Sequence, residues 1–220
     1  MSNNVPVLYS FLRCPYAMRA RIALLEAKVN CLIREVDLKN KPSDMLKISP
    51  KGTVPVLLLD NGRMIEESLE IIYYALDKHD SLDIQKRPQK EQEQIKALIN
   101  KNDTEFVKLL RPYKYSEKYP DYSPESCKQE IQDKFLDKYE EMLEGNLFLL
   151  RLKSITDIAI LPFIRQFAMV DQEWFYNSKY KNIITWLKRF TDNPDFQNIV
   201  MAKYKPWNKS SKPFYLLPNS

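Results

Sequence analysis

Residues 13–25 read RCPYAMRARIALL, and this stretch decides how the N-terminal part of the chain folds. Its apolar residues recur every three or four positions and form two stripes, one starting at Ala17 and one at Met18. This spacing predicts a helix from Pro15 to Val29 with apolar side chains on two faces. A helix of that kind is expected where it lies between a sheet and a second layer.

Two predicted strands flank this helix. A short apolar run covers Val5 to Tyr9, and the segment LIREVD, from Leu32 to Asp37, alternates apolar and polar side chains in the period of a half-buried strand. A strand, a helix and a strand within about 30 residues predict a right-handed, parallel βαβ unit.

A hairpin and a further helix are predicted next. Residues 54–59 and 63–66 flank the dipeptide Asn61-Gly62, which is a strong hairpin signal. A helix is then expected from Ser68 to about Lys78. Because the order βαβ-ββα is complete by residue 79, we expect an α/β domain over residues 1–79.

The chain after a charged linker, residues 80–88, has helical periodicity throughout. Helices are predicted at roughly 89–110, 124–144, 154–170 and 180–191. Ser154 and Asp157 match a capping box in which Asp takes the place usually given to Glu, and we interpret the pair as structural. The sequence therefore predicts an all-helical domain over residues 89–220 that ends in a basic tail.

The residue counts exclude several kinds of site. The three glycines, Gly52, Gly62 and Gly145, are too far apart for the GxGxxG or GxxxxGK loops that cradle nucleotide phosphates. The three cysteines and the single histidine, His79, contain no CxxC and no HExxH spacing. We therefore expect neither a nucleotide cofactor nor a metal ion.

The charge pattern argues against nucleic acid and membranes as partners. The net charge is +5, but residues 203–220 carry four lysines and no acid, and without them 30 basic side chains face 29 acidic ones. No basic face that would neutralise many phosphates is expected. The first ten residues lack the pattern of a secretory leader, and no stretch approaches the roughly 18 apolar residues of a membrane span. We expect a cytoplasmic protein, since three scattered cysteines are typical of a reducing compartment.

Cys14 is the strongest candidate for chemistry. A thiol at the point where a strand leads into a helix lies among unpaired backbone amides, at the positive end of the helix dipole. Pro15 suits the first helical position, and Arg13 adds positive charge. Such settings lower the pKa of a cysteine from about 8.5, so we expect Cys14 to be substantially ionised at neutral pH. The alternative, an inert buried cysteine, fits Cys31 with its apolar neighbours better.

Three motifs in order carry a resemblance to a known family. RCPYAMRARIALL is followed by KGTVPVL and then by MIEES, and together they resemble the N-terminal thioredoxin-like domain of the glutathione transferase superfamily. The helical remainder resembles that superfamily's C-terminal helical-bundle domain. The cysteine at the helix start and the stretch DLKNKP look most like the omega class. The resemblance implies a homodimer that acts as a glutathione-dependent thiol transferase or dehydroascorbate reductase.

The resemblance also implies a glutathione site. Val54-Pro55 resembles the cis-proline dipeptide whose backbone pairs with the cysteinyl part of glutathione. Glu67 and Ser68 resemble the pair that holds the ammonium and the carboxylate of the γ-glutamyl end, and Lys41 resembles the basic residue at the glycyl carboxylate. Taken singly, Ser68 also fits a simple N-cap, Lys41 a solvated loop charge and Pro55 an edge-strand proline.

The residue three positions after Cys14 bears on the type of reaction. Dithiol oxidoreductases of related fold carry a second cysteine there, whereas this chain has Ala17. Cys14 is therefore expected to hold glutathione as a mixed disulfide that a second glutathione releases, in a ping-pong reaction. Cys31 stays open as a resolving thiol, although it lies beyond the far end of the helix.

The acceptor site and the tail leave alternatives open. Arg165 and Trp207 resemble residues of the omega-class acceptor cleft, but a solvated arginine and a core tryptophan fit them as well. The tail is either disordered or folds residues 214–216 back over the helical domain. Two other functions are consistent with the scaffold: a conjugating transferase that uses the hydroxyl of Tyr9 or Ser10, and a non-catalytic interaction protein.

Overall fold

The structure, a computed structural model, describes residues 5–217, and of Gln85 only the backbone. The chain divides into two compact units. Among the described residues, one unit consists of 5–81 together with 193–217, and the other is Leu82–Asp192. The helical domain expected over residues 89–220 is therefore shorter at its C-terminal end, because the residues after Asp192 pack with the first unit.

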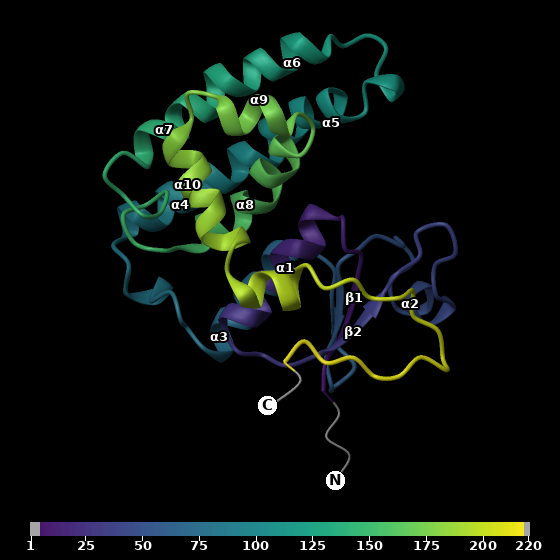
Figure 1. Ribbon diagram of the computed structural model, residues 1–220. Helices are drawn as coiled ribbons and strands as arrows, with labels where there is room; N and C mark the ends of the chain where they lie inside the picture. Colours follow the sequence, from purple (N-terminus) through teal and green to yellow (C-terminus); the bar gives the residue numbers. More distant parts are fainter. Residues whose placement is uncertain (1–4, 218–220) are drawn as a thin grey trace. The chain divides into compact units, whose positions relative to one another are not determined.

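The first unit is built on a four-stranded sheet in the order β2-β1-β3-β4; Figure 1 labels β1 and β2. Strands β1 and β2 run parallel, with Val7 opposite Leu32, and the other neighbouring pairs are antiparallel. The predicted βαβ unit and the hairpin across Asn61-Gly62 are thus both confirmed. The strands are β1 (Val7–Ser10), β2 (Leu32–Glu35), β3 (Val56–Leu58) and β4 (Met64–Ile65).

Three helices cover the faces of this sheet: α1 (Pro15–Glu26), α2 (Ser43–Ile48) and α3 (Ser68–Lys78) (Figure 1). Met45 of α2 is buried in a cluster with Tyr9 and Val56 of the strands. Because side chains alternate along a strand, Leu8 points to the other face, where α1 and α3 pack against one another (Figure 1). The predicted thioredoxin-like domain is confirmed, and α2 lies in a stretch expected only as a connection.

The C-terminal segment, residues 193–217, adds to the same sheet. After the π-helical segment η5 (Phe196–Val200), the chain runs along the free edge of β2. The backbone N–H of Ile33 donates to the carbonyl oxygen of Phe214 at 2.7 Å, and that of Leu216 donates to Cys31 at 2.8 Å. The segment is therefore ordered on the first unit, and neither expectation for it was right; Pro218 to Ser220 lie outside the described residues.

The second unit is helical, as predicted. Its core includes the edge-to-face aromatic pairs Phe106–Phe135 and Phe106–Phe167. Two of the predicted long helices are interrupted by π-helical segments, which divide each into three parts. The elements are η1 (Ile84–Lys86), α4 (Gln89–Lys101), η2 (Asn102–Phe106), α5 (Val107–Lys114), η3 (Ser116–Lys118), α6 (Pro124–Ile131), η4 (Gln132–Leu136), α7 (Asp137–Met142), α8 (Ile155–Ala168), α9 (Gln172–Asn177) and α10 (Lys181–Thr191).

The capping box at the start of α8 is confirmed as structural. The Ser154 hydroxyl accepts from the backbone N–H of Thr156 at 3.2 Å, and the Asp157 carboxylate accepts from the N–H of Ser154 at 2.9 Å. Asp157 is fully buried and also accepts from the indole of Trp186 at 2.9 Å. Its carboxylate therefore ties the start of α8 to α10.

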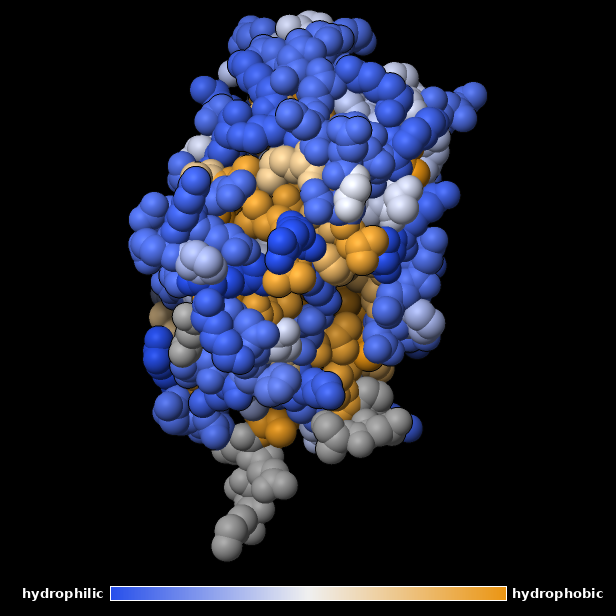
Figure 2. Space-filling model, turned by 90° about the vertical axis from the view of Figure 1, so that its left-hand side faces the viewer, coloured by the Kyte–Doolittle hydropathy of each residue, from blue (hydrophilic) through white to orange (hydrophobic). Residues whose placement is uncertain are grey.

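The surface is mainly hydrophilic on the face that Figure 2 shows, with hydrophobic side chains reaching it in places. Exposed large hydrophobic residues include Leu147 and Leu152, in the loop between α7 and α8. Over residues 5–217, no helix is long and apolar enough to cross a membrane.

Candidate functional site

The candidate site is built around Cys14, the residue that precedes α1. Its backbone is extended, with φ −78° and ψ 121°, so the helix begins directly after it at Pro15. The N–H of Cys14 donates to the carbonyl oxygen of Phe11 at 3.0 Å, and its own carbonyl accepts from Met18 at 2.9 Å. The side chain is half-buried. The predicted position of the thiol, at the junction of strand and helix, is therefore confirmed.

Val54-Pro55 lies directly against this thiol. The peptide bond between the two residues is cis. The Sγ–H of Cys14 donates to the carbonyl oxygen of Val54 at 3.5 Å. Pro55 is buried and starts the chain into β3, while Val54 is half-buried. Three of the predicted site residues, 40 positions apart in sequence, are thus brought together by the fold.

The pKa of Cys14 departs from the expected direction. Burial of the thiol raises its pKa above the ordinary value, and this effect exceeds those that favour the thiolate. The favourable effects are the ones foreseen, since the backbone amides of Ala17 and Tyr16 and the charges of Arg21 and Arg19 all lower the pKa. The prediction of a lowered pKa was wrong because it took no account of how far the fold removes Cys14 from water.

Glu67 and Ser68 lie at the start of α3. Glu67 is the N-cap residue, its side chain is 62% exposed, and its carboxylate accepts from Lys51 Nζ at 2.7 Å. Ser68 is the first helical residue and is buried. Ser68 is therefore not the N-cap that the simpler interpretation suggested, and an exposed carboxylate stands beside a helix start.

Lys41 lies beside the loop that leads to Val54. A Cβ added to Gly52 would be 3.3 Å from Lys41 Nζ, so the ammonium group is close to the Gly52 backbone. Gly52 has a φ of +62°, a conformation that favours glycine. Lys41 is half-buried. Its ammonium group therefore lies beside this loop.

The two hydroxyls considered for a conjugating activity are buried. Tyr9 is 1% exposed, and its phenol oxygen accepts from Arg34 Nη1 at 2.6 Å. Ser10 is fully buried, and its hydroxyl accepts from Arg21. Each hydroxyl is thus engaged by an arginine inside the first unit.

The two candidate acceptor residues belong to different units. Trp207, in the C-terminal segment, donates its backbone N–H to Glu35 at 2.8 Å, and its ring lies 4.0 Å from the Arg34 guanidinium. Trp207 is half-buried, so its ring packs on Arg34 outside the buried core. Arg165 is a half-buried residue of α8, and burial lowers its pKa.

The chemistry available at the site is that of one thiol. All three cysteines are free, but Cys31 and Cys127 are buried, and burial raises the pKa of both. Over residues 5–217, no group of three or more His, Cys, Asp or Glu side chains is arranged to hold a metal ion.

Comparison with known proteins gives the family. Residues 8–87 match the family model described as Glutathione S-transferase, N-terminal domain. The chain is 31% identical over 202 residues to Glutathione S-transferase L3 from Arabidopsis thaliana, an alignment that covers 88% of this chain and 81% of the relative. The chain belongs to the glutathione S-transferase family.

A solved structure shares the fold of this chain. A glutathione transferase from Methylococcus capsulatus str. Bath matches it with a TM-score of 0.71 at 26% identity, over 90% of this chain and 97% of that chain. Two other curated relatives align with this chain over shorter stretches, so that the chain spans 37% and 48% of their respective lengths. The second of these is Probable glutathione S-transferase DHAR1, cytosolic, from Oryza sativa subsp. japonica, 33% identical over 105 residues, or 48% of this chain.

Sequence reasoning missed three charged residues near the site. Lys51 pairs with Glu67, and Arg21 and Glu35 hold the backbone just before Cys14. Nothing in the sequence pairs Lys51 with Glu67. A signal for Arg21 was present, because an arginine in a helix with two apolar faces has to be buried and partnered.

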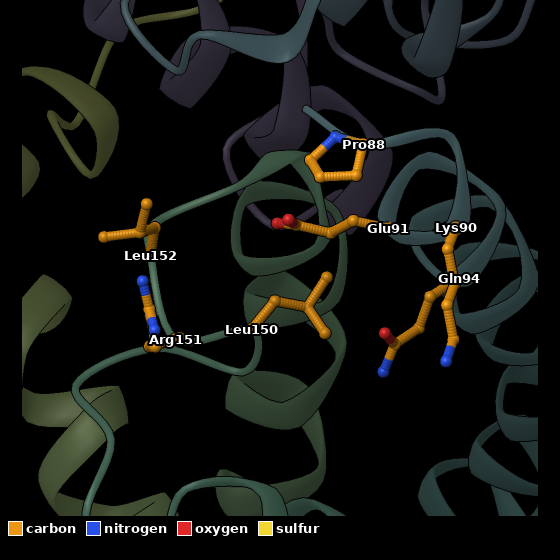
Figure 3. A pocket seen from close by; sticks show the side chains of 7 residues that line it. All are labelled: Pro88, Lys90, Glu91, Gln94, Leu150, Arg151 and Leu152. Atoms are coloured by element: carbon orange, nitrogen blue, oxygen red, sulfur yellow. The ribbon is translucent and has the colours of Figure 1, made fainter. Parts of the chain in front are cut away.

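The helical unit also carries an open groove of about 370 Å³ (Figure 3). Side chains from the start of α4 line one side, and a loop before α8 lines the other. None of the predicted site residues is among them. The lining residues are Pro88, Lys90, Glu91, Gln94, Leu150, Arg151 and Leu152.

Proposed function

We propose that this protein is a glutathione-dependent thiol transferase with Cys14 as the nucleophile. The observation that carries the proposal is the place of this thiol, half-buried at the start of α1 and hydrogen-bonded to the Val54 carbonyl. Cys31 and Cys127 are both buried, at 0% and 3% exposure. Cys14 is therefore the cysteine best placed to meet a substrate.

Glutathione binding is proposed at the residues around the thiol. The Val54 backbone would pair with the cysteinyl part, Glu67 would take the γ-glutamyl ammonium, and the amides at Ser68 would take its carboxylate. Lys41, held beside Gly52, would meet the glycyl carboxylate. The ammonium of glutathione would replace Lys51 at Glu67 or bind beside it. Separating the exposed Lys51–Glu67 ion pair would cost little free energy.

The proposed reaction is an exchange of disulfides in two steps. Cys14 loses its proton to solvent, and the thiolate attacks the glutathione sulfur of a mixed disulfide; the substrate leaves as a thiolate and takes up a proton. Free glutathione, as thiolate, then attacks the Cys14–glutathione disulfide, and oxidised glutathione leaves. Ala17 supplies no second thiol, and Cys31 is fully buried, which supports release by glutathione.

Dehydroascorbate is proposed as one acceptor substrate. The omega-like motifs and the alignment with the DHAR1 relative support dehydroascorbate as one acceptor, reduced by two electrons from two glutathiones. Arg165 and Trp207 remain predictions as acceptor residues. A cytoplasmic location and a homodimer also remain predictions.

A conjugating transferase that uses Tyr9 or Ser10 is the less favoured alternative. Both hydroxyls are buried and already accept hydrogen bonds from arginines. A hydroxyl that activates the thiol of bound glutathione has to reach that thiol. The geometry therefore favours the cysteine.

The test compares Cys14→Ser with Cys127→Ala, a change at a buried cysteine of α6. Loss of the nucleophile should lower thioltransferase turnover of a glutathionylated peptide by at least about 10³-fold, whereas Cys127→Ala should retain it. Conjugation of glutathione to an aromatic halide is measured on the same samples. Full thioltransferase activity in Cys14→Ser would refute the proposal, and rapid conjugation that survives the change would support the alternative.

A further inference from the structure

Arg21 reaches back from the second turn of α1 to the backbone just before Cys14. Its guanidinium donates to the carbonyl oxygen of Leu12 at 3.0 Å, to that of Phe11 at 3.4 Å and to the hydroxyl of Ser10. The side chain is fully buried. We call residues 11–14 the Cys14 loop. Arg21 thus binds backbone carbonyl groups of this loop.

Glu35, at the end of β2, binds a backbone amide of the same loop. Its Oε1 accepts from the backbone N–H of Leu12 at 2.8 Å. Both backbone groups of Leu12 are therefore bound by charged side chains. Glu35 is 6% exposed, and burial raises the pKa of its carboxyl group, while the hydrogen bond from Leu12 and the positive charge of Arg21 act in the opposite direction.

The C-terminal segment supplies the outer support for both charged residues. Arg21 Nε donates to the carbonyl oxygen of Val200 in η5 at 2.8 Å. The backbone N–H of Trp207 donates to the carbonyl oxygen of Glu35 at 2.8 Å. Val200 is thus linked to the Cys14 loop through the buried side chain of Arg21, and Trp207 is bonded to the backbone of Glu35, whose side chain binds the same loop.

We propose that Arg21 is a positioning residue for Cys14. Arg21 binds the backbone carbonyl groups of the Cys14 loop and connects this loop to the C-terminal segment. The proposal rests on the proposed function only in assigning Cys14 as the nucleophile. The planar guanidinium suits this task because it donates in several fixed directions at once, which a lysine ammonium cannot reproduce. Its positive charge also favours the thiolate, as does that of Arg19, the other arginine that acts on Cys14.

The experiment separates charge from positioning with two variants of the full chain. Arg21→Met removes both the charge and the hydrogen bonds. Arg21→Lys keeps the charge but cannot donate in the several fixed directions of the guanidinium group. Arg87→Met is the matched control, since Arg87 is also buried and donates to backbone carbonyls, of Leu82 and Lys153, in the other unit. The rate of Cys14 alkylation by iodoacetamide is measured against pH, together with thioltransferase turnover.

Arg21→Met should move the midpoint of the alkylation profile upward by about one pH unit, because a nearby positive charge is lost. Arg21→Lys should leave the midpoint close to wild type while turnover falls about tenfold or more. Arg87→Met should change neither. Unchanged midpoint and turnover in a folded Arg21→Met protein, or an equal shift in Arg87→Met, would overturn the proposal.

If Arg21→Met does not fold, Arg21→Lys decides, and wild-type turnover in that variant overturns the positioning role. If the proposed function itself is wrong, the result differs from loss of the positioning role, because Cys14→Ser then keeps thioltransferase activity. The alkylation profile reports on the Cys14 thiol whether or not the protein transfers thiols.

Discussion

The thiol of Cys14 is subject to opposing influences that are each identifiable. Burial and the hydrogen bond from Sγ–H to the Val54 carbonyl favour the neutral thiol. Two backbone amides and two buried arginines favour the thiolate. Because burial is the largest effect, the pKa of Cys14 lies above its ordinary value. The raised pKa thus favours the protonated thiol.

The pH dependence of alkylation follows from this direction. Only the thiolate reacts, so the rate for Cys14 without glutathione should keep rising with pH beyond about 8.5, where an ordinary cysteine titrates. The measurement is mass-spectrometric mapping of the Cys14 peptide after timed reaction with iodoacetamide. The denatured protein is the control and should show the ordinary midpoint. A rate that has already levelled off at pH 7 would show that burial does not dominate.

Gly52 offers a test of the proposed role of Lys41. A Cβ at position 52 would lie 3.3 Å from Lys41 Nζ and 3.1 Å from Leu46, so Gly52→Ala should displace the ammonium group. Gly62→Ala is the matched control, because Gly62 also has a positive φ, +83°, but no atom within 4 Å of the added Cβ.

Both glycine variants should lose about 1 kcal/mol or more of unfolding free energy through backbone strain. Only Gly52→Ala should also raise the KM for glutathione, by roughly three- to tenfold, since a charge-assisted contact is weakened. Chemical denaturation and steady-state kinetics measure the two effects. An equal KM in the two variants would count against Lys41 as a glutathione ligand.

Among the elements, the C-terminal segment has the clearest structural task. It covers the free edge of β2 through hydrogen bonds at Ile33 and Cys31, and Trp207 stacks on Arg34. An uncovered edge strand is a template for pairing with another chain. The segment therefore protects the sheet as well as supporting the Cys14 loop.

Truncation after Ala202 tests this task. The loss of the edge hydrogen bonds and of the Trp207 ring should lower the Tm by about 5 °C or more and promote self-association. Thermal melting and size-exclusion chromatography measure the two effects. Lys212→Ala, at an exposed position of the same segment, is the control and should behave as wild type. A truncated chain with the wild-type Tm would show that the segment does not stabilise the sheet.

The elements that were predictable are those with a local signal. The two apolar stripes placed α1, the Asn61-Gly62 dipeptide placed the hairpin, and Ser154 with Asp157 placed the start of α8. The short α2 lies in a polar stretch without a long apolar period. The residues after Val200 have no regular period, so their pairing with β2 depends on a partner far away in sequence.

Across the whole chain, the site residues that could be predicted are again those that carry a local sequence motif. Cys14, Val54 and Pro55 carried motifs, and the fold brings them together. The contacts of Arg21 and Glu35 could not be derived, because each joins segments that meet only in three dimensions. The pKa of Cys14 could not be derived either, since it depends on burial that many residues create together.

The assembly of the chain is a further prediction at this scale. The resemblance implies a homodimer, and the protein should therefore elute at twice the chain mass of 26.1 kDa. Light scattering coupled to size-exclusion chromatography gives the mass directly. A single species of 26.1 kDa at micromolar concentration would contradict the prediction.

The central claim, that Cys14 carries glutathione as a mixed disulfide, is tested most directly by trapping that species. The protein is incubated with oxidised glutathione, quenched in acid and analysed by intact mass and peptide mapping. We predict one glutathione per chain, on the peptide that contains Cys14, removed by free glutathione and absent from Cys14→Ser. An adduct found only at Cys31 or Cys127, or no adduct under conditions in which the protein turns over substrate, would contradict the account.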